Sequence, residues 1–377
     1  MEFLAAIPKY GFWFLLLLTI LVFVHELGHY LIARLCGVRV EVFSIGFGPE
    51  LFGRTDAHGT RWKFSAIPLG GYVKMFGQGA NLFEGEAGKA MSPEERAVAF
   101  DFKSVWRRMA IVFAGPAANY VFAALVFALI FATHGKDIAV PVIAEVTPNS
   151  AAERAGLQAG DRIVALNGSG IQSFDQIAQF IGLNLDQEIT IQYERAGVVA
   201  TTFAKPDIVL DKDFLGKDVR VGRLGVRSGD AGERVELGIV DSLTEGTKRV
   251  FEISGLMLKG IWQMVTGVRP ADEIGGVIRI GYMSGALAEA SLWSLVMFSA
   301  MLSVNLGLVN LFPVPLLDGG HLVFYAIEAI RGRPLGERMQ EWGFRVGIAF
   351  VLGLMLFATW NDLVYFDVID YIKALVT

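Results

Sequence analysis

Four long apolar stretches, separated by polar and glycine-rich segments, dominate the hydrophobic pattern of this chain. They cover residues 10–35, 109–133, 292–311 and 346–360. Because a helix needs about 20 residues to cross a hydrocarbon core roughly 30 Å thick, the pattern predicts four transmembrane helices. The composition agrees with this prediction, since 53% of the 377 residues are hydrophobic and only 19% are charged.

The distribution of basic residues predicts how these helices are oriented. Lysines and arginines gather between the first and second stretches and between the third and fourth, whereas only Lys9 precedes the first stretch. Since cationic loops stay in the cytoplasm, we expect both segments there, with the termini and the long insert on the far side. The net charge of −5 offers no basic surface, so we expect no nucleic-acid partner.

The segments between the apolar stretches differ in character. Residues 38–75 alternate apolar and polar positions between glycines, which predicts a membrane-associated β segment, and residues 81–101 are polar and loop-like. In the insert, residues 156–168 (GLQAGDRIVALNG) resemble the core signature of a PDZ domain. Such a domain binds a peptide by adding a strand to its sheet, and a β-rich spacer without a ligand is the alternative. Residues 243–265 form an apolar-faced helix expected to lie along the membrane surface.

The predicted fold is therefore an α-helical polytopic membrane protein with a membrane-associated β segment and an inserted α+β PDZ domain. The segments are transmembrane helix 1 (1–36), β segment and loop (37–104), transmembrane helix 2 (105–134), PDZ domain (135–206), linker with an interfacial helix (207–290), transmembrane helix 3 (291–320), cytoplasmic loop (321–343), and transmembrane helix 4 with the C-terminal tail (344–377).

The first apolar stretch contains an H-E-x-x-H pattern, His25-Glu26-Leu27-Gly28-His29. Residues four apart share a helix face, so both imidazoles can bind one Zn²⁺, and Glu26 can act as the general base. Each ionisable residue at the bilayer centre costs about 2.5–3.5 kcal/mol, which favours a functional reason for the cluster over simple helix packing. Cys36 is the only cysteine, so a metal site built of cysteines alone is excluded.

A catalytic zinc site needs a third protein ligand, with the fourth position left to water. Asp318 is the best placed carboxylate, because it follows the third stretch directly in a segment whose helix is ended by Pro313 and Pro315. At membrane depth such irregular backbone is tolerated only where it is buried in protein or lines a wet cavity. The alternatives are a plain loop carboxylate at Asp318, or a ligand among Asp137, His321, Glu328 and Asp362.

Taken together, these motifs resemble the site-2 protease family of intramembrane metalloproteases, most closely its RseP-type bacterial branch. The similar segments span nearly the whole chain: H-E-L-G-H, Phe47-Gly48, Pro68-Leu69-Gly70-Gly71-Tyr72, Gly115-Pro116-Ala117-Ala118-Asn119, the PDZ segment and Leu317-Asp318-Gly319. The resemblance implies a Zn²⁺ cofactor held by His25, His29 and Asp318, with Glu26 as base. Close relatives often carry two PDZ domains, whereas this sequence has one signature, which leaves gating by a PDZ pair open.

The resemblance also implies substrates and a location. It implies cleavage of membrane proteins of the single-span anti-sigma-factor type, and of remnant signal peptides, in the bacterial inner membrane. The PDZ domain would be periplasmic and the metal site would lie toward the cytoplasm. Asn305 and Asn310 are amides in an apolar stretch that could bind an unwound substrate backbone, or could instead pack helices together. A non-catalytic adaptor and a metal transporter are the rival functions.

Overall fold

The computed structural model describes residues 2–78, 91–182, 184–185, 187–212, 216–229 and 233–368. They form two compact units. One contains the chain up to Phe127, Gly246–Ser254 and the residues from Ala271 onward, and the other contains Ala128–Glu245 and Gly255–Pro270. Two helices, α4 (Val105–His134) and α7 (Ile239–Val265), contribute residues to both units.

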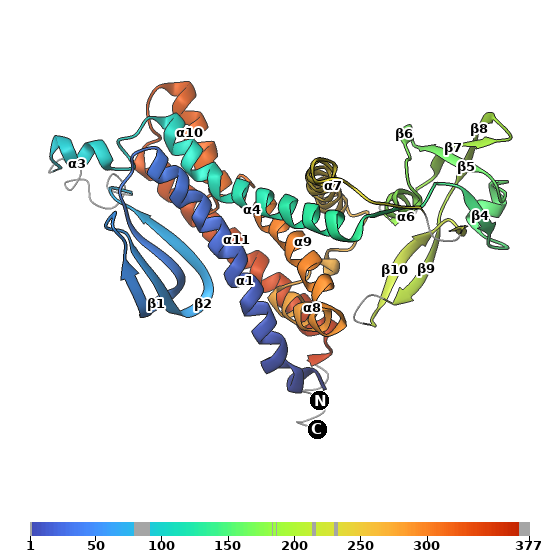
Figure 1. The fold of residues 1–377 in the computed structure, drawn as a ribbon, viewed down its shortest axis with the longest axis horizontal. Coiled ribbons are helices and arrows are strands. Elements are labelled where there is room, and N and C mark those ends of the chain that lie inside the picture. Colours follow the sequence, from blue (N-terminus) through green and yellow to red (C-terminus); the bar gives the residue numbers. More distant parts are fainter. Residues whose placement is uncertain are drawn as a thin grey trace. The chain divides into compact units, whose positions relative to one another are not determined.

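Four helices in the described part of the chain are long and apolar enough to cross a membrane. They are α1 (Glu2–Leu35), α4, α9 (Leu292–Asn310) and α11 (Glu337–Tyr365) (Figure 1). The four apolar helices predicted from the sequence are thus confirmed. Helix α1 ends where Gly37 takes a positive φ of 72°, and the N–H groups of Gly37 and Val38 then bond the carbonyls of Arg34 and Ala33.

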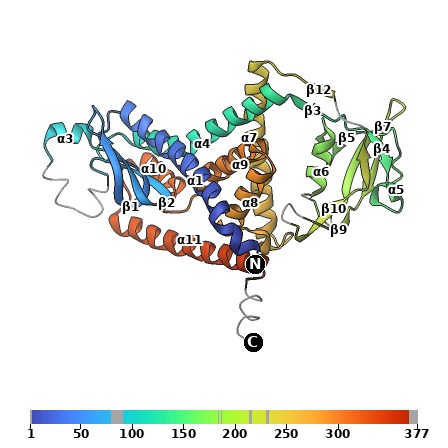
Figure 2. The same cartoon turned by 60° about the horizontal axis from the view of Figure 1, so that its bottom comes forward.

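A two-stranded antiparallel hairpin lies beside α1 (Figure 2). Its strands are β1 (Val40–Thr55) and β2 (Arg61–Met75). The hairpin packs on α1 because Phe43 is buried and stacks on Trp62, with ring centroids 4.3 Å apart, next to Tyr30. The predicted loop at 81–101 needs a correction, because a short helix, α3 (Pro93–Val98), begins at a capping box on Ser92. Residues 79–90 lie outside the described part.

The second unit holds a small α+β module around one apolar core. Strands β6 (Ser169–Gly170), β5 (Arg162–Leu166), β7 (Ile189–Arg195) and β8 (Val198–Ala204) form its sheet in that order. Strand β4 (Ile143–Val146) and the helices α5 (Ala151–Arg154) and α6 (Phe174–Gly182) complete the predicted part. The core contains Ile163 and Leu166 of the signature segment, together with Ile189 and Ile191 of β7.

The predicted end of this module at residue 206 is wrong. Strand β11 (Val226–Ser228) pairs with β4, and Leu224, only 3% exposed, packs in the same core. Strands β9 (Asp207–Lys212) and β10 (Asp218–Arg223) form a hairpin between them, and β12 (Glu233–Val235) pairs with β3 (Lys136–Ile138). Long-range pairing therefore extends the module about twenty residues beyond the expected boundary.

Two further helices replace segments that were predicted as linker or loop. After the short 3₁₀ turn η1 (Ala271–Glu273), helix α8 (Val277–Ala290) packs against α1 and α9 around Leu17 and Leu295. Helix α10 (Asp318–Arg331) occupies about the first half of the predicted cytoplasmic loop. The apolar-faced helix expected at 243–265 lies within α7.

Candidate metal centre

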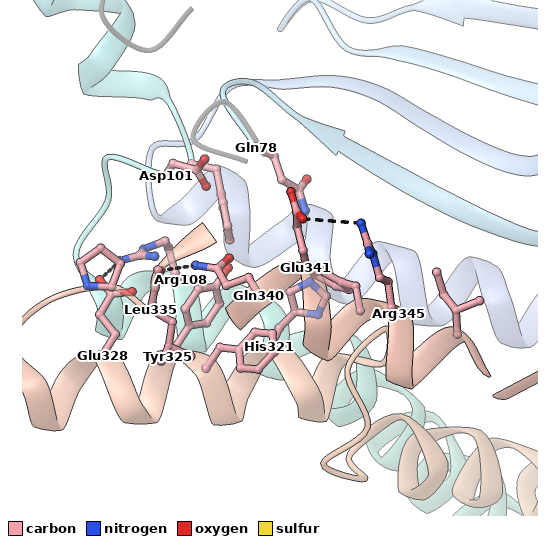
Figure 3. A pocket seen from close by; sticks show the side chains of 16 residues that line it. Gln78, Asp101, Arg108, His321, Tyr325, Glu328, Leu335, Gln340, Glu341 and Arg345 are labelled. Carbon is pink, nitrogen blue, oxygen red and sulfur yellow. Dashed lines mark hydrogen bonds and ion pairs between the residues drawn. The ribbon is translucent and has the colours of Figure 1, made fainter. Parts of the chain in front are cut away.

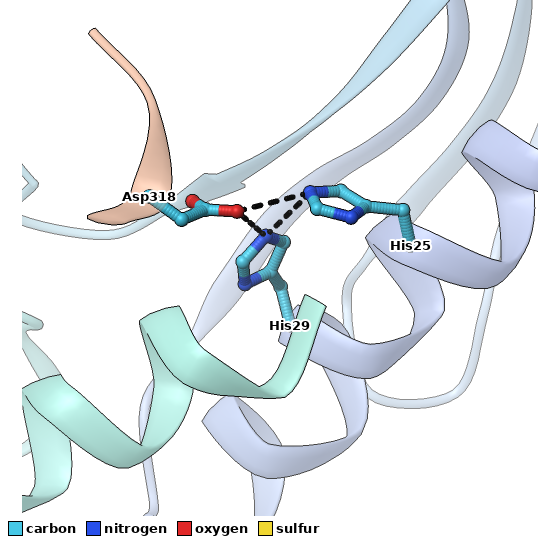
Figure 4. A group of neighbouring side chains, drawn as sticks. All are labelled: His25, His29 and Asp318. Atoms are coloured by element: carbon cyan, nitrogen blue, oxygen red, sulfur yellow. Dashed lines mark hydrogen bonds and ion pairs between the residues drawn. The ribbon is translucent and has the colours of Figure 1, made fainter. Parts of the chain in front are cut away.

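Three predicted ligands converge at one point between α1 and α10 (Figure 4). His25 and His29 lie one turn apart on α1, and their Nε2 atoms are 3.2 Å from each other. Asp318 is the first residue of α10, and its Oδ2 lies 3.1 Å from Nε2 of His25 and 3.5 Å from Nε2 of His29. The side chains are largely buried, with 10–19% of each exposed.

These separations fit a tetrahedral zinc ion. Ligand atoms about 2.0–2.1 Å from zinc lie about 3.3–3.4 Å from one another, because a tetrahedron's edge is about 1.63 times its centre-to-corner distance. The observed spacings of 3.1, 3.2 and 3.5 Å bracket that value. In addition, Oδ2 of Asp318 is buried without a hydrogen bond of acceptable geometry, although both rings are close. The donor set, two imidazoles and one carboxylate, is one that zinc accepts.

The backbone between α9 and α10 folds back sharply, which brings Asp318 beside His25 and His29. Helix α9 ends at Asn310 ahead of Pro313 and Pro315. Leu316 has a φ of 113°, which is strained for a residue with a side chain. The following glycines permit the return, because a Cβ on Gly320 would lie 2.6 Å from Cα of Pro315, and one on Gly319 would overlap the carbonyls at the end of α9. This segment is irregular, as the two prolines predicted.

Helix α4 supports both imidazoles from behind. Nδ1 of His29 is 2.8 Å from the carbonyl oxygen of Ile111, and Nδ1 of His25 is 3.1 Å from the side-chain Nδ2 of Asn119. Helices α1 and α4 approach each other closely because Gly28 on α1 and Gly115 on α4 lack side chains. A Cβ on Gly28 would lie 2.7 Å from Cβ of Ala118, and one on Gly115 would overlap the ring of His29. Asn119 belongs to one of the segments that resemble the family, but the sequence does not predict its contact with His25.

Glu26 and one of the two predicted asparagines line a cavity of about 260 Å³ that contains the three ligands. Gly71 of β2 touches the turn of α1 that bears Glu26, since a Cβ there would lie 3.1 Å from Cγ of Glu26. Tyr72 and Val73 of the same strand also line this cavity. Asn310 is a lining residue, whereas Asn305 is not among the described residues that line it.

A larger cavity of about 990 Å³ adjoins the metal site (Figure 3). Gln78, Phe100, His321 and Tyr325 line both cavities, so the two share a wall. The Arg108 guanidinium pairs with Glu328 at its edge and lies 4.8 Å from the ring centroid of Tyr325. Burial raises the pKa of the Tyr325 hydroxyl above its ordinary value, so it stays protonated at neutral pH.

The other candidate ligands lie elsewhere. Glu328 is paired with Arg108, and Asp362 accepts hydrogen bonds from the backbone at the start of α8. His321 lines the cavity, but its Nδ1 is 3.1 Å from the carbonyl of Leu317, and the residue is not part of the cluster of three. The side chain of Asp137 falls outside the described part of the structure. Of the predicted ligands, the structure brings together His25, His29 and Asp318.

Comparison with known proteins places the chain in a family. The model of peptidase family M50 matches residues 13–354. A provisionally named zinc metalloprotease of Agrobacterium fabrum is 45% identical over 93% of this chain and 94% of its own length. A similarly named protein of Rhizobium meliloti is also 45% identical, over 93% of this chain and 95% of its own. Metalloprotease MmpA of Caulobacter vibrioides is 38% identical over 96% of this chain and 97% of its own.

Among solved structures, the PDZ domain of an SdrC-like protein from Listeria monocytogenes covers 25% of this chain and 93% of its own, at 17% identity and a TM-score of 0.20. That similarity is too low to assign a fold. The family model and the relatives, in contrast, cover the segment that carries the three convergent ligands and Glu26. Four apolar helices and this match describe an integral membrane enzyme. The chain therefore belongs to peptidase family M50, the site-2 family of zinc metalloproteases.

Proposed function

We propose that this protein hydrolyses peptide bonds within or beside the transmembrane segments of other membrane proteins. The single observation that carries the proposal is the convergence of three ligand atoms, 3.1–3.5 Å apart, from the apolar helix α1 and the start of α10, in a cavity that Glu26 also lines. A structural zinc site closes its fourth position with a fourth protein ligand. The cluster of three, by contrast, faces open space that a scissile peptide and a water molecule could share.

Each residue has a distinct role in this proposal. His25, His29 and Asp318 hold the metal, which when bound supplies a Lewis acid for the scissile carbonyl and lowers the pKa of water. Glu26 lines the same cavity, and its carboxylate takes the proton from the attacking water and passes it to the leaving amide nitrogen. The surrounding apolar helices limit the entry of bulk water, which strengthens these electrostatic interactions.

A substrate helix must unwind before it can be cut, because its backbone hydrogen bonds are otherwise satisfied internally. Strand β2 would pair with such an extended segment through Gly71, Tyr72 and Val73, which line the cavity. Asn310 lines it too and would offer its amide to the freed backbone. Asn305 lies one and a half turns away on α9, and we assign it a contact farther along the substrate.

The insert offers a second place for a peptide. A groove of about 630 Å³ lies beside α6 and is lined by Ile177, Ala178, Leu224 and Val226. Strand β11 pairs with β4 on one side, and a peptide could add to its other edge in this groove. We propose that this PDZ-like module selects substrates, either by binding a peptide end or by excluding bulky far-side domains. Ala178→Arg should alter the cleavage of full-length substrates, whereas Val198→Arg, on the exposed β8, should not.

The charge distribution supports a proposal for the location. The relatives come from bacteria, and the basic segments around Arg108 and Arg331 favour the cytoplasmic side. We propose a multi-pass protein of the bacterial inner membrane, with the metal site toward the cytoplasm and the PDZ-like module in the periplasm. Its substrates would be single-span proteins of the anti-sigma-factor type, and remnant signal peptides.

The test is cleavage of a single-span reporter by the purified full-length protein in proteoliposomes. Glu26→Gln should retain stoichiometric zinc and lose cleavage, because the carboxamide cannot accept the proton. Glu252→Gln, an exposed carboxylate on α7, is the matched control and should cleave normally. Cleavage by Glu26→Gln at the wild-type rate would refute the assigned role, and mass spectrometry of the products would locate the cut.

A further inference from the structure

Asn119 reaches the metal site from behind, on a different helix from both histidines. Its side chain is fully buried on α4, and its Nδ2 lies 3.1 Å from Nδ1 of His25. Its Oδ1 is buried with no hydrogen-bond partner in the described structure. A buried amide with its acceptor unpaired, next to a ring nitrogen, calls for an explanation, because unpaired buried polar atoms are rare and costly.

The neighbouring ligand, His29, has its tautomer fixed by a hydrogen bond to the backbone. Nδ1 of His29 lies 2.8 Å from the carbonyl oxygen of Ile111. A carbonyl oxygen can only accept, so Nδ1 of His29 carries the proton, and Nε2 keeps its lone pair. That lone pair faces Asp318 and His25. The imidazole of His29 is thereby fixed in the form that binds a metal through Nε2.

The same requirement applies to His25, whose Nε2 also faces the cluster. For Nε2 to be a ligand, Nδ1 must carry the proton and needs an acceptor beside it. The carboxamide of Asn119 lies beside this nitrogen, and its own oxygen and nitrogen have nearly the same shape and exchange places by a half-turn of the amide. Turned in this way, Oδ1 gains the partner that it lacks.

We propose that Asn119 is a positioning residue whose carbonyl oxygen accepts a hydrogen bond from Nδ1–H of His25. The contact holds the ring in its metal-binding tautomer and orientation. The backbone at Asn119 is itself anchored, since its carbonyl oxygen accepts a hydrogen bond of 2.9 Å from the buried hydroxyl of Ser303 on α9. Loss of such an outer contact costs about 10–100-fold in metal affinity.

This inference rests on the proposed metal site and is tested without any substrate. Zinc affinity of the full-length protein in detergent is measured by competition with a chromophoric chelator. Asn119→Leu keeps the size of the side chain and removes the acceptor, so its zinc affinity should fall about 10–100-fold. Asn119→Asp keeps an acceptor and has no amide donor, so its affinity should stay within about threefold of wild type. Asn361→Leu, the same change at a buried amide on α11 that bonds the carbonyls of Ala271 and Ile274, should leave zinc affinity unchanged.

The aspartate variant distinguishes the proposed hydrogen bond from two alternatives. In one, Asn119 only fills space, and in the other its amide donates a hydrogen bond to Nδ1 of His25. If the amide instead donated to Nδ1 of His25, Asn119→Asp would lose as much affinity as Asn119→Leu, and that result would overturn the proposal. An Asn119→Leu protein that bound zinc like wild type would overturn it too. Should the leucine variant fail to fold, the aspartate variant alone decides between the two directions.

A second readout is the visible spectrum of the Co²⁺-loaded protein. Intense tetrahedral bands should appear in wild type and in Asn119→Asp, and should weaken in Asn119→Leu, because a misplaced ring distorts the site. An unchanged spectrum in Asn119→Leu would contradict the positioning role. Wild-type protein that bound neither metal would instead refute the metal site itself, so the two failures are distinguishable.

Discussion

At Gly115, the addition of a single methyl group should be enough to disrupt the metal site. Gly115 lies on α4 directly against the ring of His29. A methyl group at this position would stand 2.5 Å from Cε1 and 2.8 Å from Cδ2 of that ring. Non-bonded carbons rest about 3.5–4.0 Å apart, so the imidazole would have to move by about 1 Å. Metal–ligand distances are held within about 0.2 Å, and the displaced Nε2 could no longer complete the site.

Gly115→Ala should therefore lower zinc affinity by at least about tenfold and the rate of cleavage by about 100-fold. The helix itself should not suffer, because alanine favours a helix by about 1 kcal/mol over glycine. Circular dichroism of the full-length protein should accordingly stay unchanged, while competition with a chelator measures the loss of zinc. The control is Gly11→Ala on α1, where a methyl group meets nothing within 4 Å.

The result that would refute this reasoning is a Gly115→Ala protein that binds zinc within about threefold of wild type. That outcome would mean that α1 and α4 separate at little cost, and that the close contact does not fix the ring. Loss of zinc in Gly11→Ala would also count against it, because the effect would then follow from any glycine substitution in an apolar helix.

Three further outcomes are expected. Zinc should stabilise the folded protein by about 2.7 kcal/mol when free zinc is 100 times its Kd, and should therefore raise the temperature midpoint of unfolding. A midpoint that does not respond to zinc would contradict the site. Asp362→Ala should destabilise the protein by about 1–3 kcal/mol, because the backbone N–H groups of Gly276 and Arg279 lose their buried acceptor; chemical denaturation measures this, and a neutral effect would contradict the capping role. Burial raises the pKa of the Asp161 carboxyl, but the bonds from Arg195 and from a backbone N–H outweigh it and hold that pKa below its ordinary value. The stability that the Asp161 carboxylate contributes is thus present above about pH 4 and is lost as the pH falls through the lowered pKa. Arg195→Met should therefore lower the unfolding free energy at pH 7. The difference in unfolding free energy between this variant and wild type should narrow below pH 4.

The local parts of this structure could be predicted because short-range rules determine them. Four-residue spacing places His25 and His29 on one face, and two prolines end α9 just before Asp318. The four apolar helices follow from length and hydropathy alone. In each case the relevant information lies within about twenty consecutive residues.

The parts that the sequence did not predict depend on contacts between distant segments. Strand β11 joins the module by pairing with β4, about eighty residues earlier. Helix α8 contains two glycines, which argue against a helix locally, but Gly285 is needed because the ring of Tyr10 on α1 occupies the space of a side chain. Helix α10 likewise has Gly319 and Gly320 in its first turn, and their missing side chains let it fold back onto the end of α9. Tertiary packing overrides helix propensity at both places.

The metal site depends both on the local spacing of residues along α1 and on contacts with the distant helix α4. A four-residue spacing places the two rings of α1 on one face but leaves each free to rotate, so the motif alone does not build a rigid site. The fixing contacts come from α4, where Ile111, Gly115 and Asn119 also recur every four residues and so lie on one face. Because Asn119 meets His25, whereas Gly115 and Ile111 meet His29, the two stripes run antiparallel. A glycine followed four residues later by an amide, in a second apolar helix, is therefore a pattern by which the sequence alone could identify the helix that orients the ligands.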